Sequence, residues 1–352
     1  MSQISRLKSF IYKLTNWEYW PEWAVFSVPM IYYTFLSVRA RSFFFFNAVN
    51  PGIKYGGYTM EPKHEIYDIQ PPHLTPKTQY FKVNTNVDDI VKAISDAGLE
   101  FPLIAKPDIG MKGMAVAKVN DTSELEVYLS KAKFDFLIQE LITFPNEMGV
   151  FYYRYPDSAK GTISGIVLKE FLTVIGDGKA TISELVEREP RYMLQMEALK
   201  SEYGDEMNTI PANGEILNLV PFGNHVRGAK FLDGSHLISQ KLIDTFDSFC
   251  KDIPGFYYGR LDIRYNTFEE LERGENFSII ELNGAGSGPT HIFDPGHSIF
   301  FAWREIIRHF RIMCDIGIIN HKKGHRYLTF SEGWEMVRAN SAHIKLLEAF
   351  SK

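Results

Sequence analysis

Two apolar runs in the last third of the chain carry polar side chains of the types that bind metal ions and phosphate. Arg260, Asp262 and Arg264 alternate with apolar residues in the first run, and Glu281 and Asn283 end the second. Side chains two apart on a strand point to the same face, so each run presents its polar residues on one side. The polar segment between the runs predicts a hairpin connection. Two carboxylates and an amide are therefore expected to converge.

The second run is expected to keep this alternation along its whole length. One face then holds the following side chains: Phe277, Ile279, Glu281 and Asn283. Hard divalent cations such as Mg²⁺ take carboxylate and amide oxygens, with phosphate and water as further ligands. Asp262, Glu281 and Asn283 form such an oxygen set, and the planar guanidinium of Arg260 can bind phosphate. A hairpin with one solvated face is the alternative, but the glycine-rich exit "NGAGSG" favours a ligand.

Composition places the chain among globular proteins. Its 352 residues are 45% hydrophobic and 23% charged, which allows more than one well-buried subdomain and indicates no long disordered region. A net charge of -5 argues against a general nucleic-acid surface, so no nucleic-acid partner is expected. Cys250 and Cys314 have no His or Cys at ligand spacing, so neither a zinc site nor a disulfide is expected. The expected compartment is the reducing cytoplasm.

Aromatic residues are concentrated near the start of the chain, in "NWEYWPEWAVFSVPMIYYTFLSVRARSFFFFNAVN". The uncharged stretch from Trp23 to Val38 is shorter than the roughly 20 residues that a spanning helix needs, and Pro29 interrupts it. No small-residue cleavage site follows, so a signal peptide is not expected. We expect residues 1–75 to form an aromatic helical segment that packs against the rest of the fold or a second subunit. Peripheral membrane contact through residues 20–47 is the alternative.

Strand and helix patterns alternate from residue 79 onward, which predicts an α+β architecture. Helices are expected at residues 87–98, 122–132, 298–321 and 331–350, and strands at residues 101–107, 136–142, 149–156 and 162–176. Thr122 or Ser123 is the expected cap of the second helix, and Thr181 with Glu184 predicts a capping box. The segment 190–234 is expected to form long loops over a site.

The run "LIAKPDIGMKGMAV" contains a candidate phosphate-binding turn, which follows a strand that has Lys106 at its end. Lys106 supplies a point charge there, and Gly110 and Gly113 allow backbone amides to approach phosphate oxygens. An ordinary glycine turn between strands is the alternative for this motif alone. The segment is not a Walker loop, because no "GK[ST]" opens a helix.

In combination, these motifs resemble the ATP-grasp superfamily. The residues that carry the resemblance are "IAKPDIGMKG", "IQELITFPNE", Lys169 in "IVLKEF", "YGRLDIR" and "IIELNGAGSG". The last two look like the Arg-x-Asp and Glu-x-Asn pattern of D-alanine:D-alanine ligase, and "VIGDGKATISELV" is similar to a stretch of cyanophycin-synthetase-type enzymes. The resemblance covers residues 76–310. It implies two α+β lobes that sandwich ATP, with a hinge near residues 140–147, followed by C-terminal helices at 311–352.

The resemblance also implies a role for each matching residue. Lys106 and Lys169 would contact ATP phosphates, under a mobile loop from Asp108 to Met114 that contains Gly110 and Gly113. Further nucleotide contacts would come from Glu140, Leu141 and Ile142 around the adenine and from Glu147 at the ribose. Asp262, Glu281 and Asn283 would hold two Mg²⁺ ions, with Mn²⁺ as a substitute. Arg260 and Lys169 would be catalytic, and Arg260 would stabilise the transferred phosphoryl group.

The implied activity is that of an ATP-dependent carboxylate-amine ligase working through an acylphosphate. The alternatives are an ATP-grasp kinase or phosphotransferase, and a non-catalytic nucleotide-binding module at a membrane. Candidate contacts for the small carboxylate and amine substrates are His225, Arg227, Ser287 and His291, with surface-loop polarity as the alternative. A homo-oligomer is compatible with the aromatic segment. The usual Gly-rich α/β domain of such ligases is not recognisable before Lys106.

Overall fold

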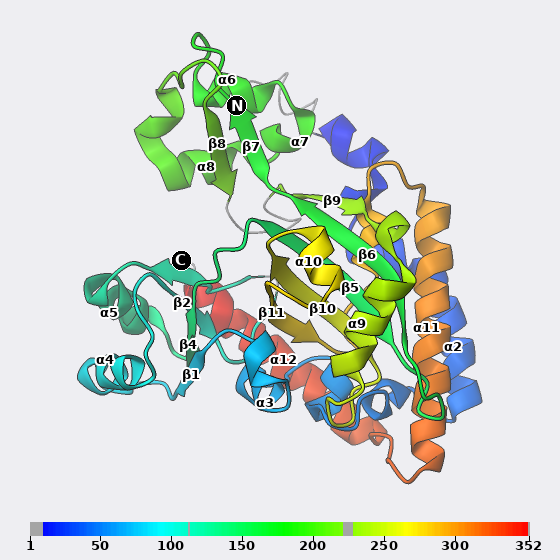
Figure 1. The fold of residues 1–352 in the computed structure, drawn as a ribbon. Coiled ribbons are helices and arrows are strands. Elements are labelled where there is room, and N and C mark those ends of the chain that lie inside the picture. The colour runs from blue at the N-terminus through cyan, green and yellow to red at the C-terminus, as the bar shows by residue number, and fades with distance from the viewer. Residues whose placement is uncertain (1–9, 112, 221–227, 351–352) are drawn as a thin grey trace. The chain divides into compact units, whose positions relative to one another are not determined.

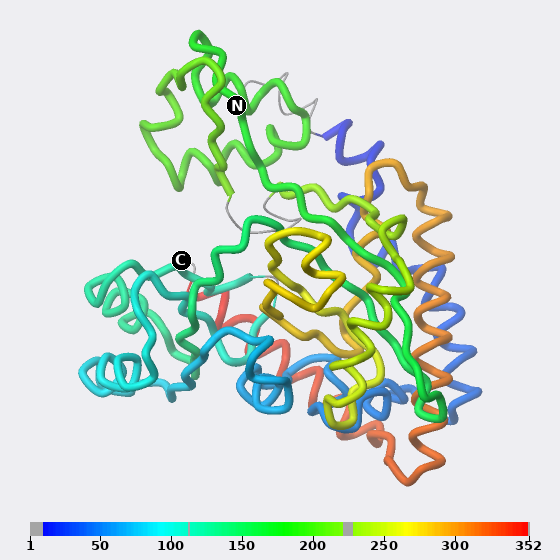
Figure 2. The backbone as a smooth tube through the Cα atoms, viewed as in Figure 1, coloured from blue at the N-terminus to red at the C-terminus, as the bar shows by residue number. Residues whose placement is uncertain are grey.

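The computed structural model describes residues 10–111, 113–220 and 228–350 of the chain. The chain divides into two compact units. The first unit holds residues 1–31, 167–236 and 290–306, and the second holds residues 32–166, 237–289 and 307–352. Figure 1 labels the elements, and Figure 2 traces the backbone through them. Both units combine helices with strands, which confirms the α+β class. The boundaries expected near residues 75 and 310 stay predictions.

One antiparallel sheet of the second unit presents the Lys106 strand. Its order is β1 (Thr78–Phe81), β4 (Phe136–Glu140), β2 (Leu103–Pro107) and β3 (Ala117–Val119). Two amphipathic helices, α4 (Val87–Asp96) and α5 (Thr122–Lys131), bury apolar residues in the same core as this sheet. The side chain of Asp121 caps α5, so the expected cap at Thr122 or Ser123 is wrong by one or two residues.

The second sheet of this unit contains the hairpin of β10 (Tyr258–Tyr265) and β11 (Phe277–Asn283), with β5 (Asn146–Tyr153) paired to β10. Helix α9 (Gln240–Cys250) contributes buried residues to this unit. The hairpin connection contains a short helix, α10 (Phe268–Glu272), which a capping box of Thr267 and Glu270 begins. Strand β6 (Thr162–Glu170) starts beside β5 and runs on into the first unit.

The aromatic segment supplies much of another core in the second unit. Within the second unit, the aromatic segment contains the end of α2 (Glu22–Ala40) and two short 3-10 helices, η2 (Phe45–Ala48) and η3 (Lys54–Gly57). These are followed by α3 (Lys63–Asp68) and η4 (Pro72–Leu74). Leu36 and Phe44 to Phe46 are buried with residues of α11 (Ile299–Lys322) and with Met336 of α12 (Phe330–Phe350). These side chains of the segment are thus buried in the core, while the packing role expected for residues 1–75 as a whole stays a prediction.

The opposite face of α2 is apolar and exposed. Trp23, Ile31, Phe35 and Val38 all present most of their side chains to solvent. Among the described residues, no helix combines the length and the apolar character that crossing a bilayer would require.

The first unit contains more regular structure than the sequence indicated. A two-stranded sheet of β7 (Leu172–Ile175) and β8 (Ile216–Val220) shares a core with α6 (Ile182–Glu187) and α8 (Met196–Tyr203). Its other elements are η1 (Trp17–Tyr19), α7 (Pro190–Met193), η5 (Gly204–Asn208), β9 (Lys230–Asp233), η7 (Ser235–Leu237) and η8 (Thr290–Phe293). The expectation of long loops is wrong for residues 190–220, because the apolar residues of these short elements bury one another; residues 221–227 lie outside the described part of the chain. The capping box of Thr181 and Glu184 is confirmed.

Candidate active site

The predicted hairpin brings the two carboxylates together. Asp262 of β10 lies directly opposite Glu281 of β11, and Arg260 lies opposite Asn283. Directly opposed residues of antiparallel strands point to the same face, so all four side chains share one side of the sheet. The convergence expected from the sequence is thus present within the second unit.

A β-bulge corrects one detail of this hairpin. The register shifts after Asp262, so that Ile263 is opposite Ile279 and Tyr265 is opposite Phe277. One extra residue on β11 reverses the alternation, and Phe277 and Ile279 lie on the face opposite to Glu281. The expectation that they share the face of Glu281 is wrong. The bulge keeps these apolar residues in the core while the carboxylate faces the site.

Arg260 holds Asp262 in a forked ion pair. Its Nε lies 3.2 Å from both carboxylate oxygens of Asp262, and its Nη2 lies 2.8 Å from Oδ2. Asn283 Nδ2 also donates to Oδ2, at 3.2 Å. Asp262 is buried, so the planar guanidinium replaces the water that this carboxylate would otherwise need.

Lys63, at the start of α3, pairs with Glu281. Lys63 belongs to none of the motifs from which the site was predicted. Burial lowers the pKa of Lys63, but the Glu281 carboxylate outweighs burial and holds that pKa above its usual value. Burial conversely raises the pKa of Glu281, but Lys63 outweighs it and holds the pKa well below its usual range. The raised pKa of Lys63 and the lowered pKa of Glu281 both mean that the two side chains form a charged pair at neutral pH.

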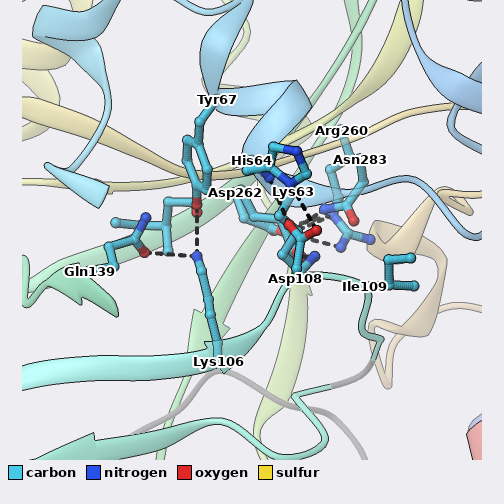
Figure 3. Close-up of polar contacts among 12 residues, drawn as sticks. Lys63, His64, Tyr67, Lys106, Asp108, Ile109, Gln139, Arg260, Asp262 and Asn283 are labelled. Atoms are coloured by element: carbon cyan, nitrogen blue, oxygen red, sulfur yellow. Dashed lines mark hydrogen bonds and ion pairs between the residues drawn. The ribbon is translucent and has the colours of Figure 1, made fainter. Parts of the chain in front are cut away.

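Lys106 reaches the same region from β2. Its Nζ donates to Tyr67 Oη and to Gln139 Oε1, both at 2.7 Å (Figure 3). Tyr67 in turn donates to the backbone oxygen of Ile280. Burial, reinforced by the positive charge of Lys63, lowers the pKa of Lys106 to about 7. Lys106 is therefore a buried amine that gains its full charge when an anion binds beside it.

Asp108, the first residue after β2, is fixed by α3. The backbone N–H of His64 donates to Asp108 Oδ1 at 2.9 Å, and His64 Nδ1 lies 2.8 Å from Oδ2 (Figure 3). The backbone oxygen of the next residue, Ile109, lies 2.6 Å from His343 Nε2 of α12. The beginning of the expected phosphate-covering loop is thus anchored on two sides.

The remaining described part of that loop has features of a tight turn. A Cβ at Gly110 would lie 2.7 Å from Pro107 Cγ, and Gly113 has a φ of +71°. That φ lies in the left-handed region, where glycine is favoured. Lys112 lies outside the described residues.

The residues expected around adenine and ribose lie at the end of β4 and the start of β5. Glu140 is exposed and accepts a 3.2 Å hydrogen bond from the backbone N–H of Lys77. Arg264 links two others, because its Nη1 donates to Ile142 O at 3.1 Å and its Nε lies 3.5 Å from Glu147 Oε2. Leu141 connects these positions and is half-buried. Their nucleotide contacts stay predictions.

The glycine cluster after β11 has a packing role. A Cβ at Gly284 would lie 2.6 Å from Gly56 O, and one at Gly286 would lie 2.0 Å from Tyr58 O. The backbone N–H of Gly286 donates to Gly57 O at 2.8 Å. These glycines let the aromatic segment approach the backbone closely. They are therefore explained without the ligand that the motif suggested.

Five other expected site residues lie elsewhere or cannot be placed. Ser287 donates to Gly284 O at 2.6 Å, within the second unit. His291 is buried in the first unit, 3.6 Å from Glu305. Lys169 also belongs to the first unit, where it lies opposite Phe231 on β9. His225 and Arg227 lie outside the described residues.

The donor types suit Mg²⁺, but the carboxylates already have cationic partners. Within the described ranges, no three His, Cys, Asp or Glu side chains are arranged to hold a metal ion as they stand. Lone pairs remain on the oxygens of Asp262, and the amide oxygen of Asn283 is a further donor. Glu61 adds Oε2, which is shielded from solvent and has no hydrogen-bond partner among the described residues. The oxygen set thus fits a divalent cation in its chemistry.

Comparisons with known proteins give structural likeness without sequence likeness. No protein-family model matches the chain, and no curated protein sequence matches it. A bifunctional glutathione synthetase from Pasteurella multocida is 16% identical with a TM-score of 0.41, over 75% of this chain and 38% of that one. A D-Ala:D-Ser ligase from Enterococcus faecalis is 14% identical with a TM-score of 0.42, over 73% of this chain and 64% of that one.

A D-alanine–D-alanine ligase from Coxiella burnetii is 8% identical with a TM-score of 0.42, over 83% of this chain and 64% of that one. By name, these three proteins are two ligases and a synthetase, and each likeness to this chain is structural, at 16% identity or less. The chain spans less than two thirds of the length of each of these three proteins. The chemistry proposed next therefore rests on the residues of this chain.

Proposed function

We propose that this chain is an ATP-dependent carboxylate-amine ligase. The observation that carries the proposal is the Asp262–Glu281 pair on one face of the hairpin, with the Arg260 fork on Asp262. Two buried or half-buried carboxylates beside an arginine suit the Mg²⁺ complex of a polyphosphate. Lys106, which also lies in the second unit, adds an amine that becomes fully charged on contact with phosphate.

The proposed reaction has two steps. A substrate carboxylate oxygen attacks the γ-phosphorus of ATP, the bond to the bridging oxygen breaks, and ADP leaves. An amine then attacks the carbonyl carbon of the acylphosphate, phosphate leaves with the bonding electrons, and the nitrogen loses a proton. No covalent attachment to the protein is required, so catalysis consists of orienting reactants and stabilising negative charge.

Residues of the chain have distinct roles in this proposal. Asp262, Glu281 and Asn283 would hold Mg²⁺, which supplies charge neutralisation on the phosphates when it is bound. Arg260 would shift from Asp262 toward the transferred phosphoryl group, because its two N–H groups match two phosphoryl oxygens. Lys106 would bind ATP phosphate, under a loop whose start Asp108 and His64 fix.

The proposal is tested by coupling ADP release to amide formation. Purified protein with ATP and Mg²⁺ is offered panels of carboxylates in the presence of hydroxylamine, and hydroxamates are measured together with ADP. Equal amounts of hydroxamate and ADP for some carboxylate are expected. ADP release that needs an acceptor but never gives a hydroxamate, while a phosphorylated product accumulates, would instead indicate a phosphotransferase.

A further inference from the structure

Lys63 is held firmly against Glu281, one of the residues that the family resemblance implies as ligands of two metal ions. Its Nζ is paired with Glu281 Oε1, and its side chain is only 14% exposed. Its backbone N–H donates to Asp108 O at 2.9 Å, and the following residue, His64, holds the Asp108 carboxylate with two contacts. The backbone and the ammonium group of Lys63 are therefore both held by contacts within the fold.

The contact uses an oxygen that a two-metal site would need. A carboxylate that bridges two ions gives one oxygen to each, and Oε1 of Glu281 already accepts the ammonium of Lys63. An ammonium and a divalent ion on the same oxygen would lie within a few Å of each other and repel. Only Oε2 of Glu281 is then suited to an ion.

Asp262 differs from Glu281 in how its cation is bound. The charge of Arg260 is spread over a planar group that contacts Asp262 edge-on through Nε and Nη2. Each carboxylate oxygen has two lone pairs, so Asp262 retains the capacity to bind one ion beside Asn283. The space beside Lys63 is small, because the cavity lined by Lys63, Tyr67 and Glu281 has a volume of about 10 Å³. Such a cavity has room for about one water molecule.

We infer that Lys63 takes the place of one of the two cations, so that the nucleotide complex of this chain binds a single divalent ion. The remaining ligands for that ion are Glu281 Oε2, Asp262 and the amide oxygen of Asn283. The inference rests on the proposed function, since it concerns the same site. It differs from the expectation of two Mg²⁺ ions, since it gives the site one ion and one fixed ammonium.

Counting bound Mn²⁺ by electron paramagnetic resonance tests the inference. The protein is saturated with a non-hydrolysable ATP analogue and titrated with Mn²⁺, and nucleotide binding is measured separately by calorimetry. The wild type and Lys63→Arg, which keeps the charge, are expected to bind one Mn²⁺ per chain. Lys63→Gln is expected to bind two, because the neutral amide releases Oε1 of Glu281.

Lys323→Gln is the matched control. Lys323 also forms an ion pair within the second unit, with Asp157 at 2.7 Å, but its side chain is 44% exposed. This variant is expected to bind one Mn²⁺. Two Mn²⁺ in the wild type would overturn the inference while leaving the proposed function intact, and so would one Mn²⁺ in folded Lys63→Gln. The wild-type count decides the question even when Lys63→Gln does not fold. Absence of nucleotide binding in folded wild type would contradict the proposed function itself.

Discussion

Asp262 and Glu281 are directly opposed on β10 and β11, and each carboxylate is paired with a cation of a different origin. The partner of Asp262 is Arg260, two residues away on the same strand. The partner of Glu281 is Lys63, from a helix in the aromatic N-terminal segment. One half of the charge balance is therefore local in sequence, and the other half depends on the tertiary fold.

Removing either carboxylate charge is expected to abolish turnover. Asp262→Asn and Glu281→Gln keep the shape of the side chain but lose the charge that binds Mg²⁺. Metal ions supply several kcal/mol of charge stabilisation, so ADP release is expected to fall by about 100-fold or more. Glu275→Gln, an exposed carboxylate paired with Arg273, is the control and is expected to keep full activity. Near-normal ADP release by both folded site variants would contradict the assignment.

Arg260→Lys is expected to reduce the rate more than the affinity for ATP. A lysine keeps the charge but loses the fork that contacts two oxygens at once. We expect kcat and kcat/KM to fall together, by roughly 100- to 1,000-fold, as for the loss of a transition-state contact. Arg273→Lys is the control, because Arg273 lies on the connection between β10 and β11, outside the site. An unchanged kcat with a raised KM for ATP would place Arg260 in ground-state binding.

Affinity for ATP is expected to fall as pH rises above about 7. Burial, with Lys63 nearby, lowers the pKa of Lys106 to about 7, while Glu281 and Asp108 raise it by smaller amounts. Phosphate favours the charged form of the Lys106 amine, so ATP binding raises the pKa of Lys106. Above about pH 7, binding is therefore accompanied by the uptake of a proton by this amine. The dissociation constant then increases toward tenfold per pH unit between about pH 7 and 9. Calorimetry in buffers of different ionisation enthalpy measures the proton uptake.

Lys106→Met is the control for this pH dependence. Its affinity is expected to be weaker and nearly flat over the same range, because no amine titrates beside the phosphate. A flat profile in the wild type, or an equal slope in Lys106→Met, would show that another group controls the affinity.

Gly286→Ala is expected to destabilise the fold, because its Cβ would lie 2.0 Å from Tyr58 O. Such overpacking costs about 1–3 kcal/mol or more in free energy of unfolding. Gly288→Ala is the control in the same motif, since its Cβ would meet no atom within 4 Å. Denaturant unfolding of both variants measures the difference. Equal stability of the two would remove the packing explanation for the glycine cluster.

The buried and exposed aromatic residues of the N-terminal segment are expected to differ sharply in their effect on stability. Phe45 is 0% exposed and Phe35 is 61% exposed. Phe45→Ala should cost about 3–5 kcal/mol, whereas Phe35→Ala should change the free energy of unfolding by less than about 0.5 kcal/mol. Thermal unfolding measures both. Equal losses would contradict the division of this segment into a packed side and an exposed side.

Local patterns predicted the strands that carry the site carboxylates and Lys106, and also the capping box of Thr181 in the first unit, because alternation and capping act over a few residues. They did not predict α3, the helix that supplies Lys63. The bulge after Asp262 was not predictable in this way. It changes which residues of β11 face those of β10, but it leaves the sequence pattern of β11 itself unchanged. The short elements at 190–234 were missed because each is too brief to show a clear period.

The candidate site was predicted less completely, because it depends on contacts between distant segments. The carboxylates and Lys106 belong to recognisable motifs. Lys63, His64 and Tyr67 belong to none, although Lys63 and Tyr67 are four residues apart on one helix and both serve the site. The glycine cluster was interpreted as the sign of a ligand, but the group that approaches Gly284 and Gly286 is the backbone of residues 56–58.

The pairing of Lys63 with Glu281 joins residues 218 positions apart, which has a consequence for synthesis on the ribosome. At about 5–20 residues per second, Glu281 is added roughly 10 to 45 s after Lys63. During that interval the ammonium has no access to its final partner, and the hairpin that completes the face does not yet exist. Under the proposed function, the site is therefore incomplete until residue 281 has been translated, and a product of premature termination before residue 281 lacks half of the charge pair.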